Sequence, residues 1–158
     1  MISEIDGVHI FNIDQRSDDR GWLTELFRHD CLEEGNHPVM AYVSMTLPGV
    51  VRGPHEHVNQ SDYFTFVGPG EFDLHLWERR ETGDGNTYVF HEKHRVGVTY
   101  PAAVIVPPGV VHAYKNVGES NGLVFNAPNE LFAGPGKKYP VDEIRHEDGH
   151  TAQFYQVE

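Results

Sequence analysis

Short alternating segments, separated by glycine and proline turns, run through most of this chain. Residues 40–47 alternate apolar and polar side chains before a Pro-Gly pair, and residues 72–77 do the same after a Gly-Pro-Gly turn. Alternation with a period of two is typical of a half-buried strand, and no stretch longer than about ten residues keeps a helical period. Strands that follow one another every 8 to 12 residues or so are typical of a β-sandwich or barrel. The sequence therefore predicts an all-β fold.

The expected strands cover most of the chain. We expect them at residues 8–13, 22–28, 40–47, 63–67, 72–77, 87–90, 94–98, 100–106, 110–116 and 123–126. Residues 14–21 are polar and predict a turn, whereas residues 22–28 have a mixed period that also allows a short helix. The best candidate for a helical turn lies around residues 31–34. Residues 151–157 would form either a last strand or a peripheral tail.

Length and charge narrow the class of protein. The 158 residues suit one domain, and no repeat, linker or low-complexity tract marks a second. Acidic residues outnumber basic ones by 24 to 12, and the formal net charge of -12 opposes binding to nucleic acid or to an anionic membrane. An anionic ligand would need a local cluster of Arg, Lys and His side chains.

Cysteine content and the N-terminal sequence bear on the compartment. Cys31 is the only cysteine, which excludes a disulfide framework and a thiolate zinc site within one chain. A single unpaired cysteine suits the reducing cytoplasm. The first residues lack the basic and apolar segments of a signal peptide, and no apolar run approaches membrane-spanning length. We expect a soluble cytoplasmic protein.

The densest group of chemically versatile side chains lies in residues 51–62, which read VRGPHEHVNQSD. Side chains two positions apart on an extended chain point the same way, so His55 and His57 are expected to share one face and Glu56 to occupy the other. Titratable groups gathered in a cleft are the usual candidates for a functional site. The alternative is that both histidines are ordinary residues of the barrel interior or surface.

Two elements of the chain carry glycine and histidine at set spacings. The first element contains Gly49, His55, His57, Asp62 and Gly70. The second contains Pro107, Gly109, His112 and Asn116. These spacings resemble the two signature motifs of the cupin superfamily, whose fold is a small jelly-roll barrel with its site inside. Asp62 stands where cupins usually have glutamate.

The cupin resemblance implies a possible metal site. In metal-binding cupins the matching residues bind a divalent ion, which here would use His55, His57, His112 and Asp62. Such a nitrogen and oxygen donor set suits Fe, Mn, Ni or Zn. A metal cupin of this kind would act as an oxygenase or as a metal-assisted isomerase. In the plainer alternative, His112 caps the Pro-Pro-Gly turn and Asp62 is a polar partner of His55 or Arg52.

A longer resemblance covers most of the chain. Residues 19–25 (DRGWLTE), 51–55 (VRGPH) and 105–114 (IVPPGVVHAY) resemble the segments of the dTDP-4-keto-6-deoxyhexose 3,5-epimerase family, also called dTDP-4-dehydrorhamnose 3,5-epimerases. That family has the same jelly roll and uses no metal. The resemblance implies an isomerase that acts on a nucleotide-linked keto sugar and needs no cofactor.

The epimerase resemblance also implies roles for particular residues. The histidine of R-G-x-H is the family's general base, which makes His55 the residue that removes a proton beside the sugar ketone. Histidine suits this role because its pKa is near neutrality. A C-terminal aspartate orients the base in the family, and we place that role on Asp148. Arg52 would steady the enolate, with help from His112.

Several positions depart from the family pattern. The family's catalytic tyrosine acid aligns with Phe125, its active-site lysine aligns with Asp62, and polar substrate contacts fall on Met40 and Tyr42. The related 3,4-ketoisomerases carry R-G-x-H-x-H, as this chain does, so single epimerisation or ketose isomerisation by a histidine shuttle remains open. A non-catalytic sugar-binding cupin is the third possibility. The candidate substrate-binding residues are Arg20, Glu25, Tyr42, His57, His112, Tyr114 and Phe125.

In the epimerase family the opening segment reaches into the pocket of the neighbouring subunit. We therefore expect a homodimer in which the N-terminal strands, about residues 1–48, are exchanged or packed at the interface. The whole chain, residues 1–158, would form one cupin domain with a C-terminal tail over about residues 127–158.

Overall fold

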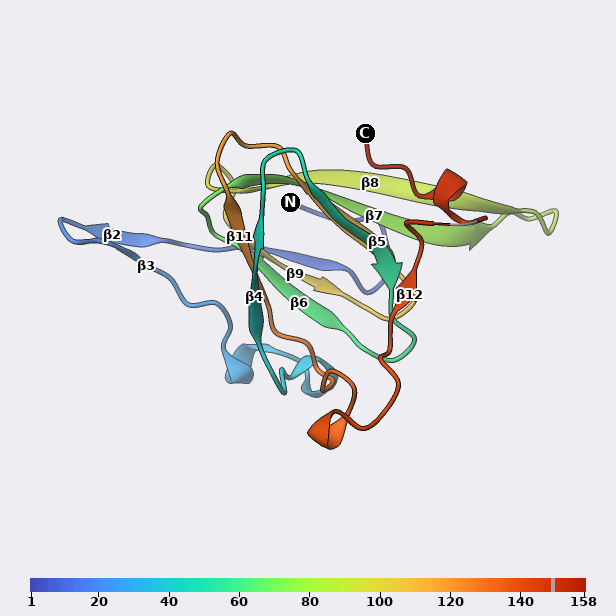
Figure 1. Cartoon of the computed structure of the whole chain (residues 1–158), viewed down its shortest axis with the longest axis horizontal. Helices are drawn as coiled ribbons and strands as arrows, with labels where there is room; N and C mark the ends of the chain where they lie inside the picture. Colours follow the sequence, from blue (N-terminus) through green and yellow to red (C-terminus); the bar gives the residue numbers. More distant parts are fainter. Residues whose placement is uncertain (149) are drawn as a thin grey trace.

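The computed structural model describes residues 1–148 and 150–158 and contains two five-stranded antiparallel sheets that face each other. One sheet has the strand order β1-β9-β6-β11-β4 and the other β12-β5-β10-β7-β8. The strands are β1 (His9–Asn12), β2 (Arg16–Asp18), β3 (Gly21–Leu23), β4 (Tyr42–Thr46), β5 (Val51–Glu56), β6 (Asp62–Phe66), β7 (Glu71–Glu81), β8 (Thr87–Gly97), β9 (Ala102–Val106), β10 (Val111–Asn116), β11 (Gly122–Asn126) and β12 (Ile144–Arg145). The predicted all-β jelly roll is confirmed (Figure 1).

The core lies between the two sheets and follows from the alternation in the sequence. Strand β7 sends Phe72, Leu74 and Leu76 into the central cluster, where each is fully buried. Trp77, one residue further along, packs instead with Val111 on the outer side of the sheet, in a separate cluster. Burial of several large apolar side chains is the main force that holds the sheets together, at about 25 cal/mol per Å² of apolar surface.

Two predicted strands form one long strand in the structure. Residues 87–90 and 94–98 belong to β8, which is continuous because it pairs with β7 along its whole length, from Glu71↔Gly97 to Glu81↔Thr87. A loop at residues 82–86 joins β7 to β8. Local periodicity misses this continuity because the polar residues 91–93 interrupt the apolar pattern, whereas pairing with β7 does not depend on it.

The helical content is limited to short 3-10 turns. They are η1 (His29–Cys31), η2 (Glu34–Asn36), η3 (Pro135–Lys137) and η4 (Ala152–Phe154). The expected helical turn around residues 31–34 is therefore split in two, and residues 151–157 form a tail with one turn rather than a strand. In the described residues, no helix is both long and apolar enough to cross a membrane.

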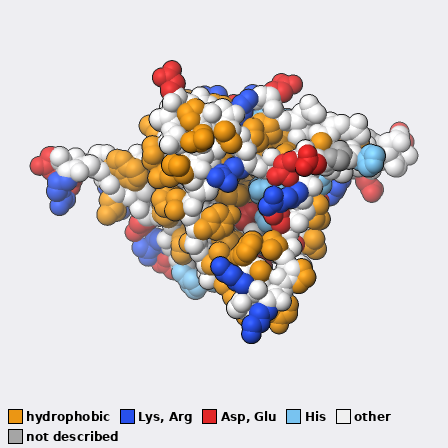
Figure 2. All heavy atoms as spheres, in the orientation of Figure 1, with side chains coloured by type: hydrophobic (Ala, Val, Ile, Leu, Met, Phe, Trp, Pro, Cys, Tyr) orange, Lys and Arg blue, Asp and Glu red, His pale blue; other side chains and the backbone are white. Residues whose placement is uncertain are grey.

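The hairpin of β2 and β3 projects away from the two sheets (Figure 1). The sequence predicts a turn at residues 14–21 and a strand at 22–28, but the structure pairs Arg16 with Leu23 and ends β3 at that residue. The arm exposes Trp22 (50%) and Leu23 (63%), and apolar side chains gather over the same side of the molecule (Figure 2). The apolar surface of this arm is therefore exposed to water, and the described residues of the chain do not cover it.

Candidate active site

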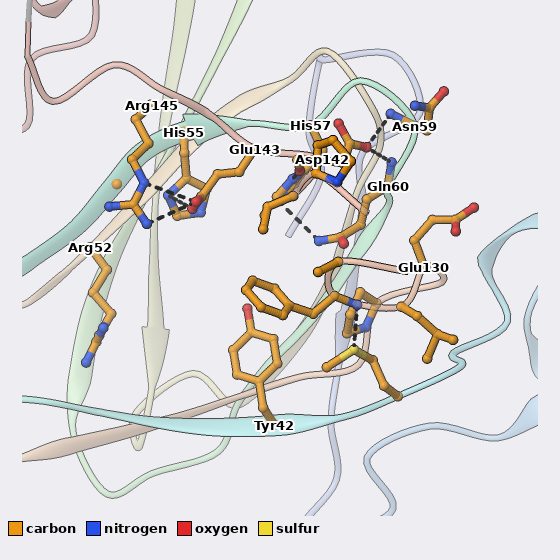
Figure 3. Close-up of a pocket in the computed structure, with 18 of the residues that line it drawn as sticks. Tyr42, Arg52, His55, His57, Asn59, Gln60, Glu130, Asp142, Glu143 and Arg145 are labelled. Carbon is orange, nitrogen blue, oxygen red and sulfur yellow. Dashed lines mark hydrogen bonds and ion pairs between the residues drawn. The ribbon is translucent and has the colours of Figure 1, made fainter. Parts of the chain in front are cut away.

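A cavity of about 840 Å³ lies between the two sheets, and its walls come from strands that are far apart in the sequence. Strands β4 and β6 line it from one sheet, and β5 and β10 line it from the other. Residues 128–147 of the C-terminal segment contribute the remaining wall. The hollow, with imidazole and carboxylate groups inside it, is visible in Figure 2, and Figure 3 shows its lining.

His55 lies near the end of β5, directly opposite His112 on β10 and Arg145 on β12. His55 and His57 both line the cavity, and Glu56 points to the other side, where it binds Arg79. The expected split between the two faces of this strand is therefore confirmed. Burial, followed by the neighbouring His112 and His57 rings, lowers the pKa of His55 to about 3. The ring is neutral at pH 7 and has a lone pair with which to accept a proton, but its pKa lies below the near-neutral value that the sequence led us to expect, which makes it a weaker base.

Asp62 is 1% exposed and lies between two imidazole rings. Its Oδ2 atom is 3.1 Å from His57 Nε2 and 3.2 Å from His112 Nε2. Its Oδ1 atom accepts hydrogen bonds from Gln60 Nε2 at 2.9 Å and Asn126 Nδ2 at 2.7 Å. Burial alone would raise the pKa of Asp62, but interactions with His112 and His57 outweigh it and hold the pKa well below its usual range. A buried carboxylate thus carries a full negative charge beneath the cavity.

The same carboxylate affects His57 in the opposite direction. Burial disfavours the charged ring and is the largest single effect, but interactions with the Asp62 carboxylate and with Asp142 together outweigh it and raise the pKa of His57. The three imidazoles of His55, His57 and His112 have ring nitrogens that all lie within 4.8 Å of one another. The site therefore combines a neutral base, His55, at the cavity wall with a charged pair, His57 and Asp62, behind it.

The C-terminal segment fixes the loop after β5. The Asp142 carboxylate accepts hydrogen bonds from the backbone N–H groups of Val58 (2.8 Å), Asn59 (2.7 Å) and Gln60 (2.9 Å). Its own carbonyl oxygen accepts from the Nδ1–H of His57. One residue of the tail therefore sets both the backbone of this loop and the orientation of the His57 ring.

Glu143 and Arg145 of the same segment lie beside His55 (Figure 3). Glu143 Oε1 is 3.8 Å from His55 Nδ1, and Glu143 Oε2 is 3.0 Å from Arg145 Nη2. Asp148, expected to orient His55, is exposed and does not line the cavity. That expectation is corrected: because β12 pairs with β5, it places Glu143 next to His55 and carries the chain past the site before Asp148.

Phe125 also lies away from the predicted position. Its neighbours on β11 face inward, since Val124 belongs to the core cluster and Asn126 reaches Asp62. Side chains alternate along a strand, so Phe125 faces the outer side of β11 and does not line the cavity. The expectation that Phe125 contacts substrate is corrected for this reason.

Three predicted residues besides the histidines do line the cavity, namely Arg52, Tyr42 and Tyr114. Arg52 donates from Nε to Thr46 Oγ1 (2.9 Å) and from Nη2 to the carbonyl oxygen of Met45 (2.8 Å). Although 47% of Tyr42 is exposed, its hydroxyl end lies in the cavity wall, and this desolvation raises its pKa to about 12. His112 sits behind this wall, 1% exposed.

Arg20 and Glu25 do not reach the cavity of their own chain. Arg20 is exposed in the β2–β3 turn, where it pairs with Asp18, and Glu25 lies after β3 within 3.7 Å of Arg28. Among residues 1–148 and 150–158 of the single chain, no contact brings either of them to the histidines. Their expected role in a neighbouring subunit stays a prediction.

Sequence patterns alone did not single out Gln60, Asn126 and Asp142. Gln60 had the clearest signal of the three, because it lies within residues 51–62 and its neighbours His57 and Asp62 were both candidates. Asn126 carries a weak signal, a polar amide at the end of an otherwise apolar strand. Asp142 has none, since β12 is only two residues long and its pairing with β5 depends on the whole fold.

The chain is similar in sequence to known proteins of polysaccharide and glycan biosynthesis. Residues 16–137 match the model of the family described as "Polysaccharide biosynthesis C-terminal domain". The chain is 32% identical to the probable low-salt glycan biosynthesis epimerase Agl13 of Haloferax volcanii, over 81% of this chain and 81% of that protein. It is 35% identical to the spore coat polysaccharide biosynthesis protein SpsL of Bacillus subtilis, over 73% of this chain and 74% of that protein.

Among solved structures, the fold is similar to that of a dTDP sugar isomerase from Desulfovibrio desulfuricans G20. The TM-score is 0.76 at 18% identity, and the match covers 98% of this chain and 91% of that one. This likeness concerns the fold, whereas the family match and the two curated relatives concern the sequence itself. Together they confirm the resemblance to jelly-roll sugar epimerases, and the chain belongs to the polysaccharide biosynthesis C-terminal domain family.

Proposed function

We propose that the protein is an isomerase that epimerises or isomerises a nucleotide-linked 4-keto-6-deoxy sugar. The observation that carries the proposal is the neutral imidazole of His55 in the wall of a cavity large enough for a sugar nucleotide. Similarity to a glycan biosynthesis epimerase and, in fold, to a dTDP sugar isomerase supports the reaction class and the substrate class. Ligand cavities of about 300–1,000 Å³ are usual for molecules of this size.

The reaction begins with transfer of a proton from the carbon next to the sugar ketone to His55. The C–H bond breaks, its electron pair forms the enolate, and the resulting imidazolium lies beside the Glu143 carboxylate, which stabilises its charge. Arg52 lines the cavity and uses only two of its five N–H groups on Thr46 and Met45, which leaves the other three for a substrate oxygen. A fixed cation stabilises the developing oxyanion without reorganisation.

A panel of dTDP- and UDP-linked 4-keto-6-deoxyhexoses tests the proposal. Incubation with the protein, followed by NMR of the recovered sugar nucleotides, is expected to reveal a new epimer or a 3-keto isomer for at least one of them. Thermal stabilisation by a sugar nucleotide with no change in any sugar would show a binding module instead. The absence of both turnover and binding across the panel would contradict the proposal.

A second candidate, a metal-dependent cupin isomerase, is favoured by the directions of two imidazole lone pairs. His112 Nδ1 is 3.1 Å from the Val110 carbonyl oxygen, and His57 Nδ1 contacts the Asp142 carbonyl oxygen. Carbonyl oxygens only accept, so both rings donate from Nδ1 and, when neutral, direct a lone pair from Nε2 toward Asp62 Oδ2. In a histidine that binds a metal through one ring nitrogen, the other ring nitrogen usually donates a hydrogen bond to a group such as a backbone carbonyl oxygen.

The buried atoms of the site fit a metal ion. Asp62 Oδ2 and His112 Nε2 are buried without a hydrogen bond, and a lone pair facing a carboxylate oxygen needs a proton or a cation between them. His55, His57 and His112 would hold a divalent ion, with Asp62 beside two of these rings, and the bound ion would supply a Lewis acid that polarises the sugar ketone. In that case His55 contributes a ligand rather than the base.

Elemental analysis of protein purified without chelator distinguishes the two candidates. Near-stoichiometric Fe, Mn, Ni or Zn that is lost in His112→Ala would support the metal site, and His29→Ala, an exposed histidine outside it, is the matched control. Full turnover by protein that holds no metal, unaffected by chelator, would support the metal-free reaction and contradict the metal site.

We also propose that the protein works as a homodimer in the cytoplasm. The exposed apolar arm supports the dimer, because the described residues of the single chain leave Trp22 and Leu23 exposed to water. Arg20 and Glu25 flank these two residues, so an arm that docks on a second copy would bring them to that copy as well. Strand β4 is a sheet edge whose outward side chains Val43 (54%) and Met45 (53%) are also exposed, which offers the arm of a second copy a place to pair. The free, exposed Cys31 supports a reducing compartment.

A further inference from the structure

Inversion at a carbon needs two groups, one on each face of the planar enolate. His55 lies on β5, whereas Tyr42 lies on β4, which belongs to the opposite sheet. Both line the same cavity, and Figure 3 shows the Tyr42 hydroxyl pointing from β4 toward the space that His55 and His57 border from the other wall. A sugar ring held between the two sheets therefore presents one face to the imidazole and the other to the phenol.

The hydrogen bond from Asn126 determines where the hydroxyl hydrogen of Tyr42 can point. The Oδ1 atom of Asn126 accepts from the backbone N–H of Tyr63 at 3.1 Å, and a backbone N–H only donates. Its Nδ2 atom therefore carries the hydrogens that reach Asp62 Oδ1 at 2.7 Å and Tyr42 Oη at 2.8 Å. Asp62 is an ionised acceptor, so both contacts fix the same amide orientation. The Tyr42 oxygen is an acceptor in this contact, and its own hydrogen is left for the cavity.

Two other tyrosines line the cavity, Tyr114 and Tyr139, and the first of these is committed elsewhere. Tyr114 is 5% exposed, and its hydroxyl shares a hydrogen bond of 2.8 Å with Ser44. Its ring packs edge-on against Phe64, Phe66 and Phe72. Tyr139 is 63% exposed and lies in the C-terminal segment outside both sheets, so Tyr42 is the phenol that the sheet opposite His55 presents to the cavity.

From these contacts we propose that Tyr42 is the general acid that protonates the enolate on the face opposite His55 and so inverts the carbon. The inference rests on the proposed epimerase function. Phe125 on β11 has no proton to donate, so the acid in this proposal comes from β4 instead. Tyr42 is then a catalytic residue rather than only a substrate contact.

The proton balance closes within the site and the solvent. The C–H bond breaks toward His55, which becomes an imidazolium, and the electron pair moves into the enolate. The Tyr42 O–H bond then breaks, a new C–H bond forms on the opposite face, and the ketone is restored. The phenolate that remains is held by the Asn126 Nδ2–H. Imidazolium and phenolate return to their starting states through one proton exchanged with water.

Tyr42→Phe tests the assignment with two separate readouts in D₂O. The variant keeps the ring and removes only the hydroxyl. We expect it to retain exchange of deuterium into the recovered substrate, because His55 still removes and returns a proton on its own face. Formation of the inverted sugar is expected to fall by at least about 10²-fold, the usual contribution of a general acid. Tyr100→Phe, on an exposed tyrosine outside the cavity, is the matched control and leaves both rates unchanged.

The possible outcomes distinguish a failure of the Tyr42 assignment from a failure of the proposed epimerase function. Wild-type epimer formation by Tyr42→Phe would overturn the acid role. Loss of both exchange and inversion, with the fold intact by circular dichroism, would show that Tyr42 serves in binding or positioning and would also overturn it. Failure of the wild-type protein to exchange or invert any sugar in the panel would instead reject the proposed function, and this inference with it.

Discussion

At the level of single residues, the sequence predicted the histidines better than their partners. His55 and His57 could be placed on one face because the geometry of an extended strand is local. The partners of Asp62 could not, since they come from β10 and β11, and only the closed barrel brings them within hydrogen-bonding distance. For the same reason Glu143 replaces Asp148 beside His55.

His75 gives a prediction about pH dependence. It is 1% exposed, and burial together with the neighbouring His91 lowers its pKa to about 4. The unfolded chain takes up this proton near pH 6.5 and therefore binds more protons than the folded one between about pH 6.5 and about pH 4. The free energy of unfolding thus falls as the pH falls through this window, by up to about 1.4 kcal/mol per pH unit for this group.

Replacing His75 with asparagine removes this contribution. Urea unfolding of His75→Asn between pH 7 and pH 4, values chosen to span the window, is expected to show a shallower loss of stability with acid than the wild-type protein. Charges from Asp73, His91 and Lys93 surround the ring and stay in place in the variant. His29→Asn, on an exposed histidine, is the control. Equal slopes for His75→Asn and the wild-type protein would refute the assignment.

At the level of elements, long strands with a clear period were predicted and short ones were not. Strand β7 was recognised from Phe72, Leu74 and Leu76, whereas β12 has only two residues and no period to detect. Yet β12 brings the C-terminal segment to the cavity, because it pairs with the strand that carries His55. Elements of this size are set by tertiary contacts and not by local propensity.

The close contact of β5 with β10 depends on a glycine. Gly53 has a φ of +90°, and a Cβ added there would lie 2.6 Å from the carbonyl oxygen of His112. Gly53→Ala is therefore expected to cost more than about 2 kcal/mol of stability and to displace His55 from His112.

Gly49→Ala is the matched control for this prediction. Gly49 also has a positive φ, of +75°, but its Cβ would meet nothing within 4 Å, so only the backbone cost of about 1 kcal/mol applies. Chemical denaturation of both variants gives the comparison. A loss of stability in Gly53→Ala no greater than in Gly49→Ala would show that β5 and β10 have room for a side chain there.

At the level of the whole molecule, the fold and family followed from motif spacings spread along most of the chain. The segments at residues 19–25, 51–55 and 105–114 were enough to indicate the jelly roll and the epimerase resemblance, and both are confirmed. The path of the arm was not predictable, because its strands pair with each other and leave their apolar side chains without a partner in the chain.

The dimer proposal predicts a change of mass when the arm is made polar. Trp22→Asp places a charge on a side chain that the proposed interface buries, so we expect sedimentation velocity to show a shift from dimer toward monomer. Val98→Asp, at a position that is 56% exposed and outside residues 1–48, should leave the dimer intact. A wild-type monomer, or a Trp22→Asp dimer as stable as the wild-type one, would exclude an interface built on the arm.

The central claim is that His55 removes a proton next to a sugar ketone. Its most direct test is deuterium uptake from D₂O into a dTDP-linked 4-keto-6-deoxyhexose, followed by NMR for the wild-type protein and for His55→Ala. We predict uptake at a carbon beside the ketone with the wild-type protein and a loss of at least about 10²-fold in the variant. Undiminished uptake with His55→Ala would contradict the claim.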